Sequence, residues 1–208
     1  MHTTAYQKLT SGFFDRPDVL TIARELLGKI IVTSFNGELT TARIVETEAY
    51  AGVTDKASHS YGGRRTARTE IMYREAGTAY VYLCYGIHQL FNIVTNQVDI
   101  PHAILIRGAE PLAGVPVMLH RTGKKTADFT LTRGPGNVSK ALGITLEHTG
   151  ETLFGDEFYI ASDGYVPASA DIIATPRIGV DYAGADALLP YRFIIHNNRY
   201  VSGKVIKK

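Results

Sequence analysis

The residues best suited to chemistry lie in 46–63, ETEAYAGVTDKASHSYGG. If its first five residues are extended, Glu46, Glu48 and Tyr50 point to one face of a strand, because successive side chains alternate. Glu48 is the nearer of the two acids to the loop that follows, where catalytic groups usually lie. A carboxylate in that position could activate water as a general base.

A purely structural interpretation of the same residues is also open. Glu46 could pair with an arginine of the same sheet, for which Arg43 and Arg107 are the candidates, and we favour this interpretation for Glu46. His59, taken alone, is more typical of a loop histidine that binds backbone groups. The stretch by itself therefore does not identify an activity.

A second informative stretch is 77–96, GTAYVYLCYGIHQLFNIVTN. Tyr80 and Tyr82 share one face of a strand, and Tyr85 falls at the turn beside Gly86. These hydroxyls could simply reach water. Alternatively, the rings could stack on a planar ligand, which contributes about 1–3 kcal/mol per nucleic-acid base, and a tyrosine at a hairpin tip could enter a duplex as a wedge.

Composition limits the class of protein. The chain has 208 residues, 45% hydrophobic and 20% charged, as expected for one globular domain. The single cysteine, Cys84, excludes an internal disulfide or a zinc-finger ligand set. No apolar run reaches the roughly 20 residues of a membrane span, and the N-terminus lacks the apolar core of a signal peptide. We therefore expect a cytoplasmic protein with no metal and no cofactor.

The net charge of the chain is +2, but the charged residues are distributed unevenly along the sequence. Residues 147–190 contain eight acids and only one lysine or arginine, Arg177. Such asymmetry fits a face that meets phosphates, although charge clusters are more often solvated surface. The basic clusters are Arg64, Arg65, Arg68 and Arg74; Arg121, Lys124, Lys125, Arg133 and Lys140; and Lys204, Lys207 and Lys208.

Hydrophobic periodicity and turn residues predict mixed elements without a βαβ rhythm. We expect helices at 16–27, 69–77, 111–122 and 137–144, and strands at 29–35, 38–50, 79–85, 89–95, 103–109, 157–161 and 192–196. The pattern predicts an α+β fold in a single domain, residues 1–208: a curved, mostly antiparallel β-sheet with helices packed around it and a protruding β-hairpin.

Several of these segments together resemble a known family. RIVETEAY, ASHSYGGRRTAR, GTAYVYLCYG with the downstream Asn92, and ILIRGAEP resemble the signature blocks of the 3-methyladenine (alkyladenine) DNA glycosylase family. RGPGNVSKALGI and PRIGVDYAGADALLPYRFII are similar to later segments of that family, in the same order. The resemblance covers nearly the whole chain, and RIVETEAY combined with a spaced YVYxxYG is specific.

The resemblance implies a base-excision repair enzyme that flips damaged purines out of double-stranded DNA and hydrolyses the N-glycosidic bond. Its substrates would be 3-methyladenine, 7-methylguanine, hypoxanthine and ethenoadenine. Glu48 matches the general base that deprotonates water for attack on the deoxyribose C1′. Arg107 and the backbone carbonyl of Ile178 match groups that hold this water.

The same comparison implies roles for residues around the base. Tyr50, His59 and Tyr82 match residues that line the base pocket and stack on the flipped base. Asn92 matches the asparagine that discriminates against the amino group of guanine. Tyr85 matches the wedge that fills the vacated space in the duplex.

The basic residues would contact DNA phosphates, so that binding weakens with salt; the candidates are Arg64, Arg65, Arg68 and Lys140. We expect the enzyme to work as a monomer. No lysine stands at a matched catalytic position, so we expect hydrolysis without a Schiff base, Lys56 being the nearest candidate. Gln89 and Leu90 depart from the aromatic and the smaller residue typical of the family there.

Three other functions compete with this one. A zinc nucleobase deaminase needs a cysteine pair and is excluded. A sugar hydrolase could use Glu46 and Glu48, whose Cα atoms at i and i+2 would be about 6.6–6.8 Å apart, but it leaves the tyrosines and arginines unexplained. A non-catalytic nucleic-acid-binding module of the same fold stays open, and replacement of Glu48 by glutamine separates it from an enzyme.

Overall fold

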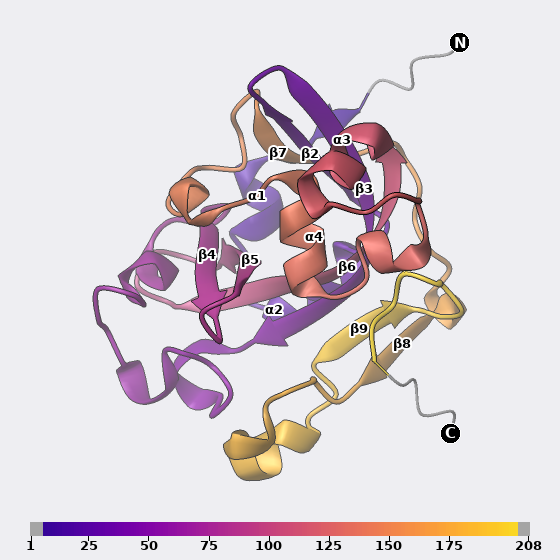
Figure 1. Cartoon of the computed structure of the whole chain (residues 1–208). Helices are drawn as coiled ribbons and strands as arrows, with labels where there is room; N and C mark the ends of the chain where they lie inside the picture. Colours follow the sequence, from indigo (N-terminus) through magenta and orange to yellow (C-terminus); the bar gives the residue numbers. More distant parts are fainter. Residues whose placement is uncertain (1–5, 204–208) are drawn as a thin grey trace.

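The computed structural model describes residues 6–203 (Figure 1). The predicted basic cluster of Lys204, Lys207 and Lys208 lies outside these residues.

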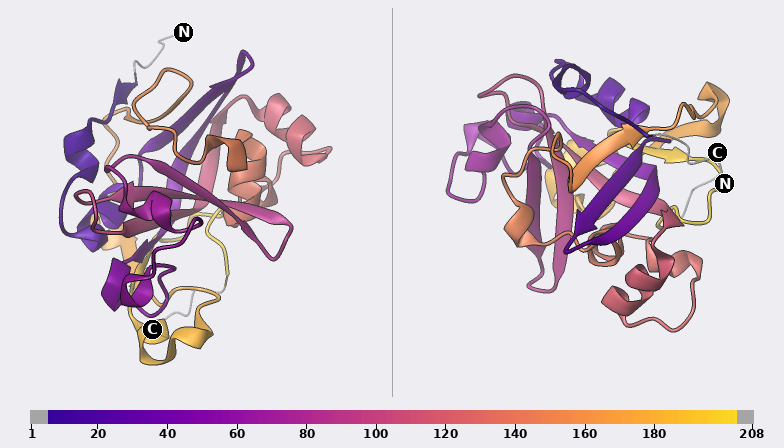
Figure 2. Two further views of the ribbon diagram at one scale, coloured as in Figure 1. Left: turned by 90° about the vertical axis from the view of Figure 1, so that its left-hand side faces the viewer. Right: turned by 90° about the horizontal axis from the view of Figure 1, so that it is seen from above.

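A nine-stranded sheet runs through the molecule, in the order β1-β7-β2-β3-β6-β5-β4, with β9 pairing β3 and β8. All of the strand pairs are antiparallel, and the sheet is strongly twisted and curved (Figure 2), so the predicted α+β class with a curved antiparallel sheet is confirmed. The strands are β1 (Gln7–Lys8), β2 (Ile30–Phe35), β3 (Glu38–Tyr50), β4 (Ala79–Cys84), β5 (His88–Thr95), β6 (His102–Ala113), β7 (Phe158–Ser162), β8 (Ile172–Thr175) and β9 (Arg192–Ile195).

Helices cover both faces of this sheet. Figures 1 and 2 show α3 and α4 on one side of the sheet and α1 and α2 on the other. The α-helices are α1 (Ser11–Phe14), α2 (Val19–Glu25), α3 (Val115–Thr122) and α4 (Pro135–Leu142). Short 3₁₀ turns lie at Gly52–Thr54, Tyr61–Gly63, Glu70–Tyr73, Phe129–Leu131, Leu146–His148, Ser169–Asp171 and Asp181–Leu188.

The predicted helix at 16–27 is shorter in the structure because a side chain defines its start. The Asp18 carboxylate accepts hydrogen bonds from the backbone N–H groups of Leu20 and Thr21, at 3.0 and 3.2 Å, so α2 begins only at Val19. Ile22 and neighbouring apolar residues then face the core.

Two other helix predictions were wrong in extent. Residues 111–113 belong to β6, and α3 starts only after Gly114, whose φ of +74° breaks the strand. The predicted helix at 69–77 forms only a 3₁₀ turn, because the Thr69 hydroxyl does not cap a helix. This hydroxyl instead accepts a hydrogen bond from the N–H of Thr66 and donates one to the carbonyl of Arg64. The strands β1 and β8 were not predicted.

The centre of the sheet carries a double irregularity between β3 and β6. Ile44 lies opposite Ala109, Glu46 opposite Gly108, and Thr47 opposite Ile106, so Val45 and Arg107 are each an extra residue in their strand. Val45 and Ala49 lie in the main hydrophobic core, on the face opposite the acids, as alternation predicts.

Gly108 allows the two strands to approach at this irregularity. A Cβ there would lie 2.7 Å from the Tyr200 carbonyl oxygen and 3.0 Å from Oε2 of Glu46. We therefore expect Gly108→Ala to lower the free energy of unfolding by about 1–3 kcal/mol, the usual cost of overpacking, measured by urea denaturation. Gly155→Ala is the control, since a Cβ there meets nothing within 4 Å. Equal unfolding midpoints for both variants would contradict this account of Gly108.

Candidate active site

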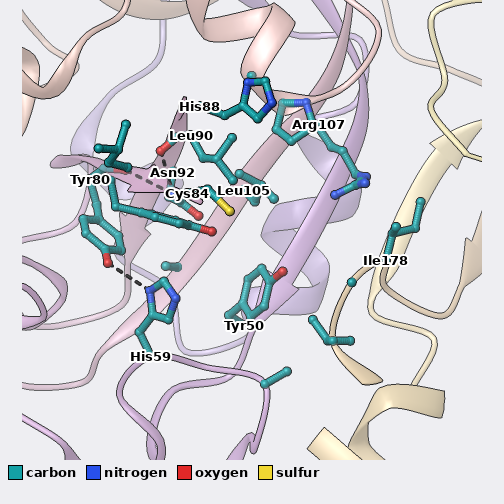
Figure 3. A pocket seen from close by; sticks show the side chains of 18 of the residues that line it. Tyr50, His59, Tyr80, Cys84, His88, Leu90, Asn92, Leu105, Arg107 and Ile178 are labelled. Atoms are coloured by element: carbon teal, nitrogen blue, oxygen red, sulfur yellow. Dashed lines mark hydrogen bonds between the residues drawn. The ribbon is translucent and has the colours of Figure 1, made fainter. Parts of the chain in front are cut away.

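A pocket of about 620 Å³ opens between the β4–β5 hairpin, the end of β3 and the segment that follows β8 (Figure 3). Residues from five separate stretches of the sequence converge on it. The predicted site residues that line it are Tyr50, His59, Arg68, Tyr82, Tyr85, Asn92, Arg107 and Ile178. Tyr80, for which the sequence leaves a stacking role open, lines it as well. Three further lining residues have no role assigned from the sequence: Cys84, His88 and Tyr182.

Glu48 has no exposed surface, but its hydrogen-bonding partners all belong to the pocket wall. The Tyr50 hydroxyl donates to Oε2 at 2.9 Å, and the backbone N–H of Ile178 donates to Oε1 at 2.9 Å. Burial, reinforced by the Glu48 carboxylate, raises the pKa of Tyr50 well above 10, so this hydroxyl remains a donor. Nε of Arg107 lies 3.5 Å from Oε1. The Glu48 carboxylate is thus held in one orientation.

Glu46 is equally buried but is committed to other groups. It accepts hydrogen bonds from Nε of Arg192 at 2.6 Å and from the backbone N–H of Ser202 at 2.7 Å. Of the two partners expected for it, Arg107 lies 3.4 Å away, whereas Arg43 binds Asp163 instead. The structural interpretation of Glu46 therefore fits, with Arg192 as the main partner that sequence analysis missed.

Arg107 lies between the two acids because of the irregularity in β6. Its Nε donates to the Ser202 hydroxyl at 3.0 Å and is within 3.5 Å of both Glu46 and Glu48. Figure 3 shows its side chain at the pocket wall near Ile178. An extra residue in a strand commonly redirects a side chain in this way.

Aromatic rings form another wall. The rings of Tyr80 and Tyr82 lie 5.4 Å apart between centroids, and the His59 ring meets Tyr82 edge-on at 4.7 Å. Nδ1 of His59 lies 2.9 Å from the Tyr80 hydroxyl, and the guanidinium of Arg68 lies 5.0 Å from the centre of the Tyr82 ring. Figure 3 shows the Tyr80 hydroxyl directed at His59, with Tyr50 on the other side of His59.

Asn92 projects from β5 into the same wall and is 3% exposed. Its amide nitrogen donates to the carbonyls of Tyr80 and Leu90, at 3.1 and 3.2 Å. The side chain is therefore fixed in position, and a ligand that reaches this wall must fit around it.

Tyr85 is at the tip of the β4–β5 hairpin, which projects from the body of the molecule as predicted (Figure 2). Both central residues of the turn have positive φ, +49° for Tyr85 and +70° for Gly86, a combination typical of tight hairpins. The Tyr85 side chain is 88% exposed and Ile87 is 75% exposed. A large apolar tip of this kind indicates a contact surface.

The predicted phosphate-binding residues are not all at the pocket. Arg68 lines it, whereas Arg65 is paired with Glu70 at 2.8 Å and with Asp99 at 2.7 Å. Lys140 lies on α4, outside the pocket lining, and is exposed, as is Arg64.

No group of three or more potential metal ligands occurs in residues 6–203. No helix within this part of the chain is both long and apolar enough to cross a bilayer. Lys56 is exposed and absent from the pocket lining.

The environment of His59 generates a pH prediction. Burial, with the positive charges of Arg68 and Arg64, lowers the pKa of His59 from 6.5 to about 4. As the pH falls, His59 is therefore protonated in the unfolded chain before it is protonated in the folded protein. The contribution of neutral His59 to the free energy of unfolding should be fully present above pH 6.5 and should be lost as the pH drops towards 4. His59→Gln, which cannot titrate, should show a shallower loss of unfolding free energy between pH 7 and 4.5.

Denaturation at several pH values measures this, with His196→Gln, at an exposed histidine, as the control. If the unfolding free energy of His59→Gln depends on pH as strongly as that of wild type, His59 is not the group responsible.

Comparison with known proteins agrees with the fold and the pocket. A family model described as methylpurine-DNA glycosylase matches residues 12–199. Proteins named "Putative 3-methyladenine DNA glycosylase" from Desulfitobacterium hafniense and Bacillus licheniformis are 43% and 47% identical to this chain. Each alignment covers 95% of this chain, and 100% and 98% of the respective relative. The chain belongs to the methylpurine-DNA glycosylase family and is a DNA glycosylase, a hydrolase of N-glycosidic bonds.

Proposed function

We propose that this glycosylase flips a damaged purine out of duplex DNA into the pocket and hydrolyses its bond to deoxyribose with a water activated by Glu48. The observation that carries the proposal is the Glu48 carboxylate, buried and oriented by three groups of the pocket wall. Arg107 and the carbonyl of Ile178 would hold the water. Among residues 6–203 no lysine lines the pocket, so the reaction would stop at hydrolysis.

A single carboxylate suits alkylated purines. A purine alkylated at N3 or N7 carries a positive charge and leaves readily, so the reaction depends on activating water more than on protonating the base. The flipped base would lie between Tyr50 on one side and His59 and Tyr82 on the other, where ring faces attract a cation. Asn92 would exclude the amino group of normal guanine. The substrates would be 3-methyladenine, 7-methylguanine, hypoxanthine and ethenoadenine.

The exposed residues would hold the DNA. Tyr85 would enter the space that the flipped nucleotide leaves, since its ring is at the tip of the projecting hairpin. Arg68 at the pocket mouth, with Arg64, Arg65 and Lys140, would contact phosphates. We further propose that residues 1–208 act as one glycosylase domain, as a monomer, in the cytoplasm.

The two-carboxylate sugar hydrolase is less well supported. It needs Glu46 to be available for proton transfer, whereas Glu46 is bound to Arg192 and Ser202.

The direct test is release of methylated purine from alkylated duplex DNA by wild type and Glu48→Gln. We expect wild type to release the base and Glu48→Gln to be at least about 100-fold slower, the usual contribution of a general base, with DNA binding retained. Equal release by both would remove Glu48 from the mechanism and direct attention to Glu46. A wild type that binds DNA but releases nothing would favour a binding module.

A second test concerns the wedge. Because Tyr85 is 88% exposed, Tyr85→Ala should leave the melting temperature unchanged. It should weaken binding to a lesion-containing duplex by about 5- to 150-fold, the equivalent of losing one stacking contact. Binding is measured by fluorescence anisotropy, with Val166→Ala as a control at another exposed side chain outside the pocket. Unchanged affinity would argue against a wedge at this position.

A further inference from the structure

Asp55 and Arg177 form a buried ion pair that the proposed chemistry does not use directly. Nη1 of Arg177 lies 2.5 Å from Oδ2 of Asp55 and Nη2 lies 2.8 Å from Oδ1, a bidentate contact. The side chain of Arg177 is 0% exposed and that of Asp55 is 2% exposed. Such a pair is strongly disfavoured unless further hydrogen bonds satisfy both groups.

Those further bonds connect three segments of the pocket wall. Arg177 also donates to the carbonyls of Ala49, at the end of β3, and of Asp186, in the 3₁₀ turn Asp181–Leu188. Asp55 accepts the N–H groups of Ala51 and Ala57 at 3.0 Å each, which fixes the loop that leads to His59. The pair is therefore the junction of β3, this loop and the segment that contains Ile178.

Arg177 is next to both groups that donate hydrogen bonds to Glu48, Tyr50 and the backbone N–H of Ile178. Its guanidinium carbon lies 4.8 Å from the centre of the Tyr50 ring, and Tyr50 donates to Glu48. The next residue in the chain, Ile178, donates the backbone N–H that binds the other oxygen of Glu48. Tyr50 and Ile178 both line the pocket and are labelled in Figure 3.

The pair also places charge behind a stacking ring. Arg177 is buried and absent from the pocket lining, which fits a position behind the Tyr50 ring as seen from the pocket. A base stacked at about 3.5 Å on the open face would lie about 8 Å from the guanidinium. At that distance an unneutralised guanidinium would repel a cationic base appreciably, because the site is shielded from water.

We propose that Asp55 and Arg177 are positioning residues that hold Tyr50 and Ile178 on Glu48, and that Asp55 enables the pocket to accept a cationic purine by neutralising Arg177. This inference rests on the proposed role of Glu48. Asp55 and Arg177 touch neither the water nor the base; they act through Tyr50 and Ile178.

The protein contains a matched control. Arg43 and Asp163 form a second bidentate pair, with Nη2 2.6 Å from Oδ2, and the guanidinium of Arg43 lies 4.6 Å from the centre of the Tyr165 ring. None of these three residues lines the pocket. The same combination of arginine, aspartate and tyrosine is thus present away from the site.

The experiment measures single-turnover release of 7-methylguanine from duplex DNA by the full chain. We expect Asp55→Asn to slow release about 100-fold, the cost of a misplaced reacting group, without weakening binding to undamaged duplex. Asp163→Asn should stay within twofold of wild type. Release by Asp55→Asn within twofold of wild type would overturn the positioning role.

A double variant separates charge from structure. Asp55→Asn with Arg177→Gln removes the unneutralised cation, so release of 7-methylguanine should recover about tenfold relative to Asp55→Asn alone. If the pair had only a structural role, the double variant would release 7-methylguanine more slowly than Asp55→Asn, because it loses more contacts. A double variant that is no faster than Asp55→Asn would therefore overturn the charge effect.

Two additional variants keep the outcome clear. Arg177→Lys retains the charge but not the bidentate contact. It should lower the melting temperature less than Asp55→Asn, because the charges still neutralise each other, and it should slow release about tenfold at a temperature where the variant is fully folded; it serves if Asp55→Asn does not fold. Unaltered release by folded Arg177→Lys would count against the positioning role. Glu48→Gln is run in parallel, because normal release by that variant refutes the proposed function rather than the role of the pair.

Discussion

The structure depends on two buried carboxylates, Glu46 and Glu48, which lie two residues apart on β3 and bind different partners. Burying an ionised carboxylate is costly unless hydrogen bonds and a cation compensate for the lost water. Glu46 receives Arg192 from β9 and Ser202 from the segment after it, while Glu48 receives Tyr50 and the backbone of Ile178. The pairing of β9 with the end of β3 serves this requirement, because it brings Arg192 opposite Glu48 and beside Glu46.

The same requirement separates the roles of the two acids. Because Arg192 is committed to Glu46, Arg107 is left between the acids and at the pocket wall, where it can act on a ligand with Glu48. The extra residue in β6 gives Arg107 this direction, and Gly108 beside it leaves room for the Glu46 side chain. Two acids that are equivalent in strand alternation thus have different partners, and their different proposed functions rest on this.

Features set by neighbouring residues could be predicted from the sequence. The alternation of β3, the hairpin that carries Tyr85 and the α+β class all follow from local patterns, and the structure has them. The partners of the buried charges could not be predicted, because Arg192 is 146 positions from Glu46 and Arg177 is 122 from Asp55. The helix predicted from Thr69 was wrong for a related reason: its hydroxyl binds loop residues, which no periodic pattern reveals.

We propose that Glu46 stabilises the fold through its buried partners, whereas Glu48 acts in the reaction. The most direct measurement is the free energy of unfolding of Glu46→Gln and Glu48→Gln, by urea denaturation at neutral pH. We expect Glu46→Gln to lose about 3–5 kcal/mol, because Arg192 is left buried without its counter-charge. Glu48→Gln should lose much less, because its amide oxygen can still accept from the N–H of Ile178 while its amide nitrogen donates to the Tyr50 hydroxyl, which can turn to accept. Equal losses, or a larger loss for Glu48→Gln, would contradict the claim.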